Sequence, residues 1–464
     1  MRLVAGVDSS TQATKVVVCD AETGKVVREG RAPHPDGTAV DPEHWWQALQ
    51  TATEGLLDDV AAIGVAAQQH GLVALDERGE VVRPALLWND NRSAQAALDL
   101  IEDFGGPQAC AEAVGSVLVA SHTASKLRWM AEHEPQLADR VTDVLLPHDW
   151  LTWRLTGEFV TDRGDASGTG YWSPRLGEYR NDLLATAFGG RTPRTPRVLA
   201  AAEPAGHTKD GKLVSAGTGD NMGAALGLAI EPGDVVVSLG TSGTVFASAN
   251  TPSADPTGII AGFADATGAF LPLVCTLNAA RVLTATATML GVEMAEFDRL
   301  ARQAAPGADG LVLLPYLDGE RTPTLPDASG TLFGLRRGNM TPQNLARAAV
   351  EGMLCGLAAG IDALREQGLP VQRVLLIGGA AQSAAVQQAA PQVFGVPVTV
   401  PAAAEYVARG AARQAAWALA GTELPPDWPL ADSVQLDVVD PQRGEQVRQQ
   451  YHAAYTELHG KTDR

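Results

Sequence analysis

Residues 235–248 read VVVSLGTSGTVFAS, two apolar stretches on either side of the small-residue turn GTSG. Apolar, mostly β-branched stretches that flank such a turn predict two strands with a tight connection. Residues 3–19 repeat the arrangement around a turn of small polar residues, and Thr241 follows Thr11 by 230 positions. We interpret the chain as two related halves, each beginning with a strand, a turn and a strand. Two unrelated hairpins are the alternative.

Helical patterns separate the predicted strands. Residues 44–60 carry apolar side chains at roughly helical spacing, after the entry signal Asp41-Pro42. A longer helix is predicted from the N-cap Thr341 to about Gln367, and glycines at its positions 352, 356 and 360 form a smooth face that another element can approach closely. Because strands alternate with helices, we expect an α/β architecture.

The composition limits the possible functions. The chain has 464 residues, 45% of them hydrophobic, which is enough for two or three globular domains. Its 54 acidic and 35 basic residues give a net charge of −19, so nucleic acid is an improbable partner. We find no leader sequence, no membrane span and no C-x-x-C pair, and we therefore expect a cytoplasmic protein whose four cysteines are core thiols.

The first small-residue turn is a candidate phosphate site. Asp8-Ser9-Ser10-Thr11 ends the first predicted strand, and Lys15, one of only six lysines, follows shortly after. Exposed backbone amides in such a turn can hold a phosphate while Asp8 holds its metal ion. A turn with Asp and Ser also occurs without any function, because these side chains bond to their own backbone.

Two further glycine turns could contact the same ligand. Gly240, Thr241 and Ser242 lie between the strands quoted first, and their amides and hydroxyls could hold an oxygen-rich anion. Residues 374–383, VLLIGGAAQS, are a strand that leads into a glycine pair, where bare backbone permits close approach of a base or a phosphate. Either turn alone is compatible with an ordinary glycine connection.

Asp220 lies in the glycine-rich segment Gly217–Gly223, between an apolar stretch and a predicted helix. An aspartate in this loop would repel a dinucleotide pyrophosphate, so nicotinamide binding is a poor fit. Asp220 could be the N-cap of the helix, or a general base that accepts the proton of a hydroxyl group. The two interpretations are compatible.

Polar side chains also gather where two other predicted strands end. Residues 68–71, QQHG, and residues 88–92, WNDNR, could bind and stack on a polyhydroxylated ligand, although a lone His70 is more often structural. The turns at 147–150 and 165–169 are polar as well, and their spacing does not decide their role.

Taken together, these segments resemble the FGGY family of carbohydrate kinases. The match follows the chain in order through residues 8–11, 68–71, 86–93, 145–159, 165–172, 217–227, 237–247, 313–323 and 374–383. Departures from the family pattern are Ser10 and Ala380, where glycine is common, Gln382, where arginine is frequent, and Gln69, where methionine is common.

The resemblance implies an α/β fold of two ribonuclease-H-like, actin-like ATPase domains that flank a nucleotide and sugar cleft. It implies domains at residues 1–230 and 231–425, followed by a tail at 426–464. By the same resemblance Asp220 is the catalytic base, and Asp8 is a catalytic acidic residue that binds the metal. The sugar-binding residues would be Gln69, His70, Asn89, Asp90 and Asn221. The ATP-binding residues would be Thr11, Lys15, Gly240, Thr241, Ser242, Gly378, Gly379 and Ser383.

The implied activity is ATP- and Mg²⁺-dependent phosphorylation of the terminal hydroxyl of a ketopentose, with D-xylulose as the expected sugar. Asp220 would deprotonate the hydroxyl that attacks the γ-phosphate in line. Ribulose, a hexulose, gluconate or glycerol are alternative substrates within the family. A non-metabolic actin-like ATPase is a more remote alternative. The expected partners are the sugar and ATP, without nucleic acid or membrane, in a protein that could be a homodimer.

Overall fold

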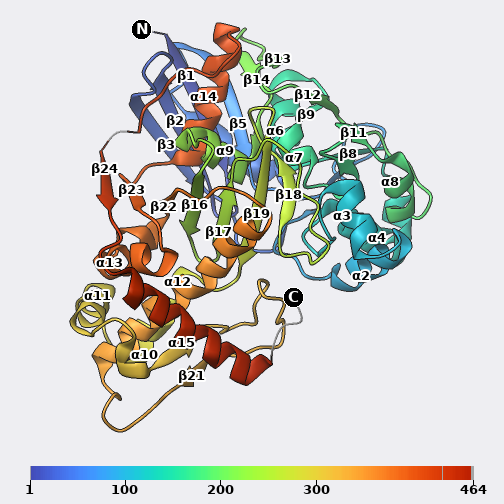
Figure 1. The fold of residues 1–464 in the computed structure, drawn as a ribbon. Helices are drawn as coiled ribbons and strands as arrows, with labels where there is room; N and C mark the ends of the chain where they lie inside the picture. Colours follow the sequence, from blue (N-terminus) through green and yellow to red (C-terminus); the bar gives the residue numbers. More distant parts are fainter. Residues whose placement is uncertain (1, 431, 461–464) are drawn as a thin grey trace. The chain divides into compact units, whose positions relative to one another are not determined.

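A computed structural model describes residues 2–430 and 432–460 of the chain (Figure 1). The described residues form two compact units that interleave along the sequence. The first unit comprises the chain up to Ile230 together with Ala249–Pro272 and Ala404–Pro429. The second comprises Glu231–Ser248, Leu273–Ala403 and the residues from Leu430 onward. Each unit is built around one large sheet.

The sheet of the first unit has the strand order β13-β14-β5-β1-β2-β3. Its strands are β1 (Leu3–Ser9), β2 (Ala13–Asp20), β3 (Val26–Pro33), β5 (Val60–Ala67), β13 (Pro204–His207) and β14 (Leu213–Ser215). The first three form an antiparallel meander, β5 and β14 continue parallel to β1, and β13 is antiparallel at the edge. The short β15 (Thr218–Gly219) also pairs with β5.

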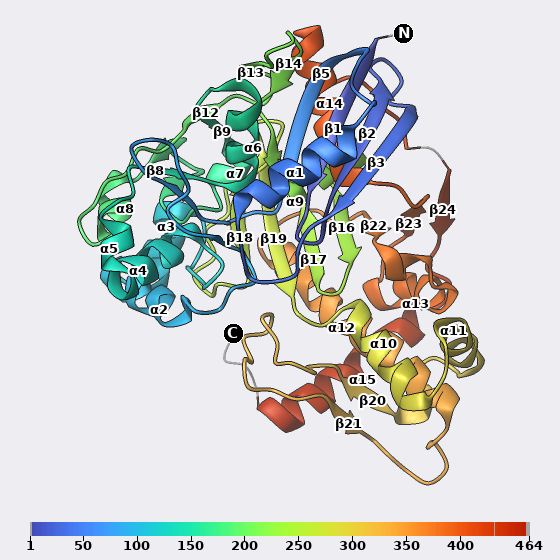
Figure 2. The same cartoon turned by 180° about the vertical axis from the view of Figure 1, so that it is seen from behind.

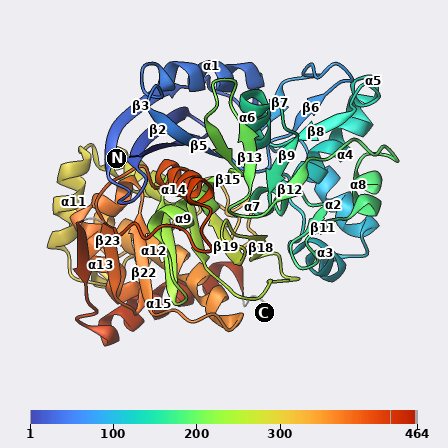
Figure 3. The same ribbon diagram turned by 90° about the horizontal axis from the view of Figure 1, so that it is seen from above.

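Helices cover both faces of this sheet, so β1 is buried along its entire length. Helix α1 (Pro42–Thr53) lies on one face, as Figure 2 shows, and α14 (Tyr406–Ala420) with α9 (Asp220–Leu228) lies on the other (Figure 3). A side chain at Gly6 in β1 would lie 1.9 Å from the carbonyl oxygen of Ala408, and one at Gly64 in β5 would lie 2.0 Å from that of Ala411. Bare backbone in both strands is therefore what lets α14 pack so closely.

Two arginines of α14 also bind the C-terminal end of α9. Arg413 donates a hydrogen bond of 2.8 Å to the carbonyl of Leu226, and Arg409 donates to that of Gly227. Cationic side chains satisfy carbonyls that the end of a helix leaves unpaired. These contacts explain why Ala404–Pro429 belongs to the first unit, although we expected residues up to 425 in the second domain.

The rest of the first unit consists of short elements, several of which surround a second apolar core that contains Leu127, Met130 and Phe188. Its helices are α2 (Ala94–Asp103), α3 (Pro107–Val114), α4 (Thr123–His133), α5 (Pro135–Ala138), α6 (Pro147–Thr156), α7 (Arg163–Ala166) and α8 (Asn181–Ala187). Its strands are β4 (Ala39–Val40), β6 (Val73–Leu75), β7 (Ala85–Leu86), β8 (Asp143–Leu145), β9 (Val160–Asp162), β10 (Trp172–Ser173), β11 (Glu178–Tyr179), β12 (Arg197–Leu199) and β18 (Ala261–Ala264).

Apart from β18, which belongs to the first unit, the strands of the second large sheet follow the order β19-β17-β16-β22-β23-β24. Its strands are β16 (Asp234–Leu239), β17 (Gly243–Ala247), β19 (Phe270–Thr276), β22 (Arg373–Ile377), β23 (Val398–Pro401) and β24 (Ser433–Leu436). An antiparallel meander, two parallel strands and an antiparallel edge strand again follow one another. Both units thus share one strand order, as the interpretation of a duplicated chain predicts.

The expected long helix of the second unit is α12 (Pro342–Glu366), with the hydroxyl of Thr341 as its N-cap acceptor at 3.1 Å from the Asn344 nitrogen. The glycines on this helix differ in how closely other residues approach them. A Cβ at Gly352 would lie 2.2 Å from the Leu313 carbonyl oxygen, whereas at Gly356 the nearest atom would be 3.7 Å away. The remaining elements are α10 (Ala280–Leu290), α11 (Met294–Gln303), α13 (Ala384–Phe394), α15 (Pro441–His459), β20 (Val312–Leu314), β21 (Thr331–Phe333) and the short 3₁₀ turns Ala308–Gly310 and Gly379–Gln382.

The expected tail at 426–464 does not form a separate element. Residues up to Pro429 pack with the first unit, β24 extends the second sheet, and α15 packs on α13 and β20. Residues 431 and 461–464 lie outside the described residues. Three of the four cysteines are buried, Cys275 is partly buried, and none forms a disulfide within the described chain. None of the helices in the described ranges combines the length and apolar character that a membrane span requires.

Candidate functional site

The register of three parallel strands brings the first-unit candidates to one edge of the sheet. Asp8 in β1 and Thr218 in β15 are both paired with Ala66 of β5. The three strands therefore end level with one another, and the residues that follow them are Ser10 and Thr11, Gln68 to His70, and Asp220. Ligands in open α/β sheets bind at the carboxyl ends of parallel strands.

Asp8 shares a cation with a residue from the distant end of the chain. Lys15 Nζ lies 3.3 Å from Asp8 Oδ2 and 2.9 Å from Glu405 Oε2, and Glu405 directly precedes α14. Burial raises the pKa of Asp8 to about 6, although the charge of Lys15 opposes this increase. The second oxygen, Oδ1, is buried and accepts no hydrogen bond from the described residues. Sequence reasoning missed Glu405, because nothing local links it to Lys15.

Asp220 is the first residue of α9, and the N-cap of this helix is Gly219 rather than Asp220, which corrects one of our two interpretations. Its Oδ1 accepts hydrogen bonds from the backbone nitrogen of Asn221 at 2.8 Å and from the side-chain amide of Asn221 at 2.9 Å. Burial raises the pKa of Asp220 to about 7, and the negative charge of Asp8 contributes to this increase. A carboxyl group with this pKa can accept a proton near neutral pH.

Two amide side chains continue the hydrogen bonds that begin at Asp220. Asn221 Nδ2 also donates to Gln69 Oε1 at 3.2 Å, whereas the buried Gln69 Nε2 has no hydrogen-bond partner among the described residues. Gly219 lacks a side chain where Gln69 packs, since a Cβ there would lie 2.7 Å from Gln69 Cγ. Asp220, Asn221 and Gln69 therefore form one connected polar group.

His70 adopts a left-handed backbone with φ of 68°. Its Nδ1 lies 2.7 Å from the carbonyl oxygen of Gly168, and its ring is 5.2 Å from that of His122 and 5.6 Å from that of Phe263. A non-glycine residue in this region is held by its surroundings and commonly marks a functional site. The ring of His70 is thus fixed by contacts from three other segments.

The segment after β7 is held by bonds within the protein. Asp90 accepts hydrogen bonds from Arg92 Nε at 2.7 Å and from the Thr38 hydroxyl at 2.7 Å, and although its burial opposes ionisation, these donors lower its pKa. Trp88 Nε1 donates to the Thr11 hydroxyl at 2.8 Å. Asn89 keeps its buried Oδ1 without a donor from the described part of the chain.

In the second unit, two of the predicted turns follow neighbouring parallel strands. Ser238 of β16 is paired with Ile377 of β22, so the turn Gly240–Ser242 and the glycine pair after Ile377 lie at the same edge of their sheet. The Gly240 carbonyl accepts the backbone nitrogen of Ala280 at 2.9 Å. Gly240, Thr241, Gly378 and Gly379 are exposed, so their backbone is accessible.

Gly378 has φ of 94°, and a side chain there would lie 2.5 Å from the Leu239 carbonyl oxygen. Ser383, the N-cap of α13, has its hydroxyl engaged inside the protein. It accepts the Val386 nitrogen at 3.2 Å and donates to Asp298 at 2.6 Å. Sequence reasoning missed Asp298, which comes from α11.

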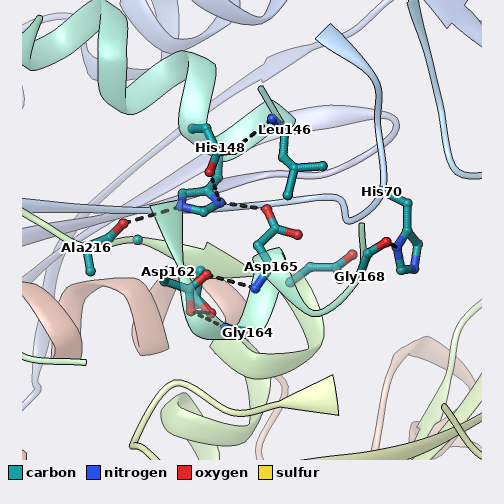
Figure 4. Close-up of polar contacts among 12 residues, drawn as sticks. His70, Leu146, His148, Asp162, Gly164, Asp165, Gly168 and Ala216 are labelled. Atoms are coloured by element: carbon teal, nitrogen blue, oxygen red, sulfur yellow. Dashed lines mark hydrogen bonds and ion pairs between the residues drawn. The ribbon is translucent and has the colours of Figure 1, made fainter. Parts of the chain in front are cut away.

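A buried charged group contacts the loop that precedes Asp220, at Ala216 (Figure 4). His148 Nδ1 is 2.6 Å from Asp165 Oδ2 and 3.3 Å from Asp149 Oδ1, and Nε2 is 3.3 Å from the Ala216 carbonyl oxygen. The His148, Asp149 and Asp165 side chains have the donor types of a metal site. The 2.6 Å separation is that of a hydrogen bond, however, and leaves no room for an ion between the two atoms. The sequence alone does not assign a role to either of these turns.

Comparisons with known proteins agree with the two-unit architecture. The FGGY family of carbohydrate kinases, N-terminal domain, matches residues 3–227, and the corresponding C-terminal domain matches residues 235–419. The chain is 48% identical to the xylulose kinase of Streptomyces coelicolor over 94% of its length and 93% of the relative, and 35% identical to that of Haemophilus influenzae over 90% and 91%. The crystal structure of xylulose kinase from Bifidobacterium adolescentis superposes with a TM-score of 0.89 at 44% identity, covering 98% of this chain and 99% of that chain.

Proposed function

Because the chain belongs to the FGGY family of carbohydrate kinases, we propose that it transfers the γ-phosphoryl group of ATP to the terminal hydroxyl of D-xylulose, forming D-xylulose 5-phosphate. Similarity to xylulose kinases over nearly the whole chain supports this sugar. The observation that carries the chemistry is a pair of carboxyl groups with raised pKa values at the ends of level strands, Asp8 near the end of β1 and Asp220 directly after β15.

In the proposed reaction, Asp220 accepts the proton of the attacking hydroxyl. A base is most effective when its pKa is close to the working pH, and the pKa of Asp220 is about 7. Its position at the start of α9 places it at the positive end of the helix dipole, which favours the ionised form and opposes the effect of burial. Hydrogen bonds from Asn221 fix the orientation of the carboxylate.

The phosphates and their metal ion would be held by Asp8, Lys15 and the backbone of the glycine turns. The buried Oδ1 of Asp8, which has no donor among the described residues, is the kind of ligand that Mg²⁺ prefers. Mg²⁺, when bound, would neutralise the charge that develops on the transferred phosphoryl group. Thr11 and Lys15, and the turn Gly240–Ser242, would contact the phosphates of ATP. Gly378 and Gly379 would lie by the adenosine, whereas Ser383 would act through the turn that it caps.

The sugar would be bound by unsatisfied amide groups. Gln69 Nε2 offers a donor and Asn89 Oδ1 an acceptor, and both are buried without a partner among residues 2–430 and 432–460. Leaving such groups unpaired costs about 1–3 kcal/mol each, which a sugar hydroxyl would recover. His70 and Asn221 would complete the contacts. Asp90 would act through Arg92 and Thr38, which it binds.

A substrate panel tests the sugar. Purified protein with Mg-ATP is offered D-xylulose, D-ribulose, D-fructose, gluconate and glycerol, and ADP formation is followed for each. We expect the largest kcat/KM with D-xylulose. A higher value with any other compound would reassign the substrate within the family.

A variant tests the base. Asp220→Ala should reduce sugar-dependent ADP formation by about 10²–10⁴-fold, which is the usual contribution of general base catalysis. Asp210→Ala, which makes the same change at an exposed turn, is the matched control and should behave as the wild type. An Asp220→Ala variant that kept more than a tenth of the wild-type turnover would exclude Asp220 as the base.

A further inference from the structure

We propose that a buried charged cluster, His148 with Asp149, Asp162 and Asp165, positions Asp220 for proton transfer. The proposal rests on the proposed function of Asp220 as the general base, and it assigns a role to the two turns whose role the sequence left open. These four residues, the His148 cluster, come from α6 and from β9 and α7. Figure 4 shows His148, Asp162 and Asp165 of this cluster, with His148 bonded to Ala216, which lies four residues before the base.

The first anchor of the loop is His148 itself. Its side chain is completely buried, and Nε2 donates to the Ala216 carbonyl at 3.3 Å while Nδ1 donates to Asp165 at 2.6 Å. Gly217, the next residue, has φ of 77°, and a Cβ there would lie 2.5 Å from His148 Cδ2. The ring therefore fills the space next to the glycine and determines the path of the loop.

The second anchor is Asp162. Its carboxylate accepts the backbone nitrogens of Gly164 at 2.9 Å and Asp165 at 2.8 Å, which caps α7, and it accepts the Thr218 hydroxyl at 2.8 Å. Thr218 is two residues before Asp220. One carboxylate thus joins α7, which carries Asp165, to the strand that ends at the base.

The same loop is also held by α14. Gln414 Oε1 accepts the Gly217 nitrogen at 2.9 Å and Nε2 donates to the Gly217 carbonyl at 3.0 Å. Residues 216–218 are therefore fixed at three consecutive positions by His148, Gln414 and Asp162. A carboxylate that follows such a loop has little freedom, and alignment of this kind is a large part of catalysis.

The charges of the cluster couple it to the base. Burial lowers the pKa of His148, but the facing Asp149, Asp165 and Asp162 outweigh this effect and raise its pKa to about 10, so the ring is a cation at neutral pH. Burial raises the pKa of Asp165, and the charge of Asp220 contributes to the increase. Because an interaction between two charges is reciprocal, the charge of Asp165 acts on Asp220 as well.

The same segment also reaches the proposed sugar site. Three residues after Asp165, the Gly168 carbonyl lies 2.7 Å from Nδ1 of His70, and a Cβ at Gly168 would lie 2.6 Å from that nitrogen. One short segment, residues 162–168, is therefore bonded both to the loop of the base and to His70. A shift of this segment would move the two together.

The test compares two substitutions at Thr218. Thr218→Val removes the hydroxyl that binds Asp162 but keeps the shape, and we expect kcat to fall at least tenfold while KM for D-xylulose changes less than threefold. Thr218→Ser keeps the hydroxyl and should retain more than half of the wild-type kcat. His148→Gln, which removes the cation, should lower kcat and move the acid limb of the pH profile. Partial unfolding alone would not move this limb.

Two controls keep the outcomes separate. All rates are expressed per folded protein, measured by circular dichroism and thermal melting, so a variant that merely unfolds keeps its specific kcat. Asp220→Asn is measured alongside. If Asp220→Asn is as active as the wild type, the proposed base is wrong. If Asp220→Asn is inactive while Thr218→Val and His148→Gln keep the wild-type kcat per folded protein and its pH profile, the positioning role is wrong and the base stands.

Discussion

Acid pH should switch off the reaction over a narrow range, because the pKa of Asp220 is about 7 and only its ionised form can accept a proton. About nine-tenths of the Asp220 carboxyl groups are ionised at pH 8, about half at pH 7 and about a tenth at pH 6. We therefore expect kcat/KM to fall about tenfold between pH 8 and pH 6. Below pH 6 the decrease should steepen, because the pKa of Asp8 is about 6 and this carboxylate is the proposed partner of Lys15 and the metal.

The assay quantifies ADP by chromatography, since coupling enzymes have pH dependences of their own. Both substrates are kept well below saturation so that kcat/KM reports the free enzyme, and the ionic strength is held constant. Asp8→Asn provides the internal control. Its residual activity should show an acid limb at lower pH, because removing the Asp8 charge lowers the pKa of Asp220. A profile that stays flat down to pH 5.5, or a limb that moves to higher pH in Asp8→Asn, would refute the reasoning.

Three further predictions concern packing, charge and stability. Gly352→Ala should lower the free energy of unfolding by about 1–3 kcal/mol, because the new methyl group would overlap a carbonyl of β20. Gly356→Ala in the same helix has room for the methyl group and should raise the free energy of unfolding by about 1 kcal/mol. Denaturant unfolding of both variants measures the difference. Lys15→Met should raise KM for ATP at least tenfold, because loss of a charged hydrogen bond costs about 1.5–3 kcal/mol. Lys25→Met makes the same change at an exposed position and should leave KM for ATP unchanged. The pKa of His148 is raised from 6.5 to about 10, so the stability that this histidine contributes is complete below pH 6.5 and is lost as the pH rises toward 10. Urea unfolding should therefore give a lower free energy of unfolding at pH 9.5 than at pH 7. In His148→Gln this difference between the two pH values should be smaller.

Sequence reasoning predicted well what is local. The strand, turn and strand units, the long helix that begins at Thr341 and the loop that ends at Asp220 are all encoded by neighbouring residues, whose spacing sets turn geometry and helix caps. The candidate residues on the first sheet also come together, because parallel pairing makes their strands end at one edge. The family resemblance added the role that we propose for each residue.

What the sequence could not predict depends on contacts between distant segments. Glu405 is 390 positions after Lys15, and its ion pair exists only because α14 packs on β1. The packing of α14 on the first sheet was not predictable for the same reason, since its small residues fit any close-packed helix and do not reveal which sheet they contact. The His148 cluster was visible only as two polar turns, because its meaning lies in distances that no spacing along the chain reveals.

The position of α14 in the chain has a consequence for biosynthesis. A ribosome releases the strands of the first sheet early, but the helix that covers one face of β1 and β5 emerges only after residue 404. Until then Gly6 and Gly64 lie in strands without their packing partner, and a nascent chain would expose an apolar surface of the kind that chaperones bind. We expect chains arrested before residue 404 to be protease-sensitive throughout their first 230 residues, and the addition of residues 404–429 as a separate peptide to restore protection.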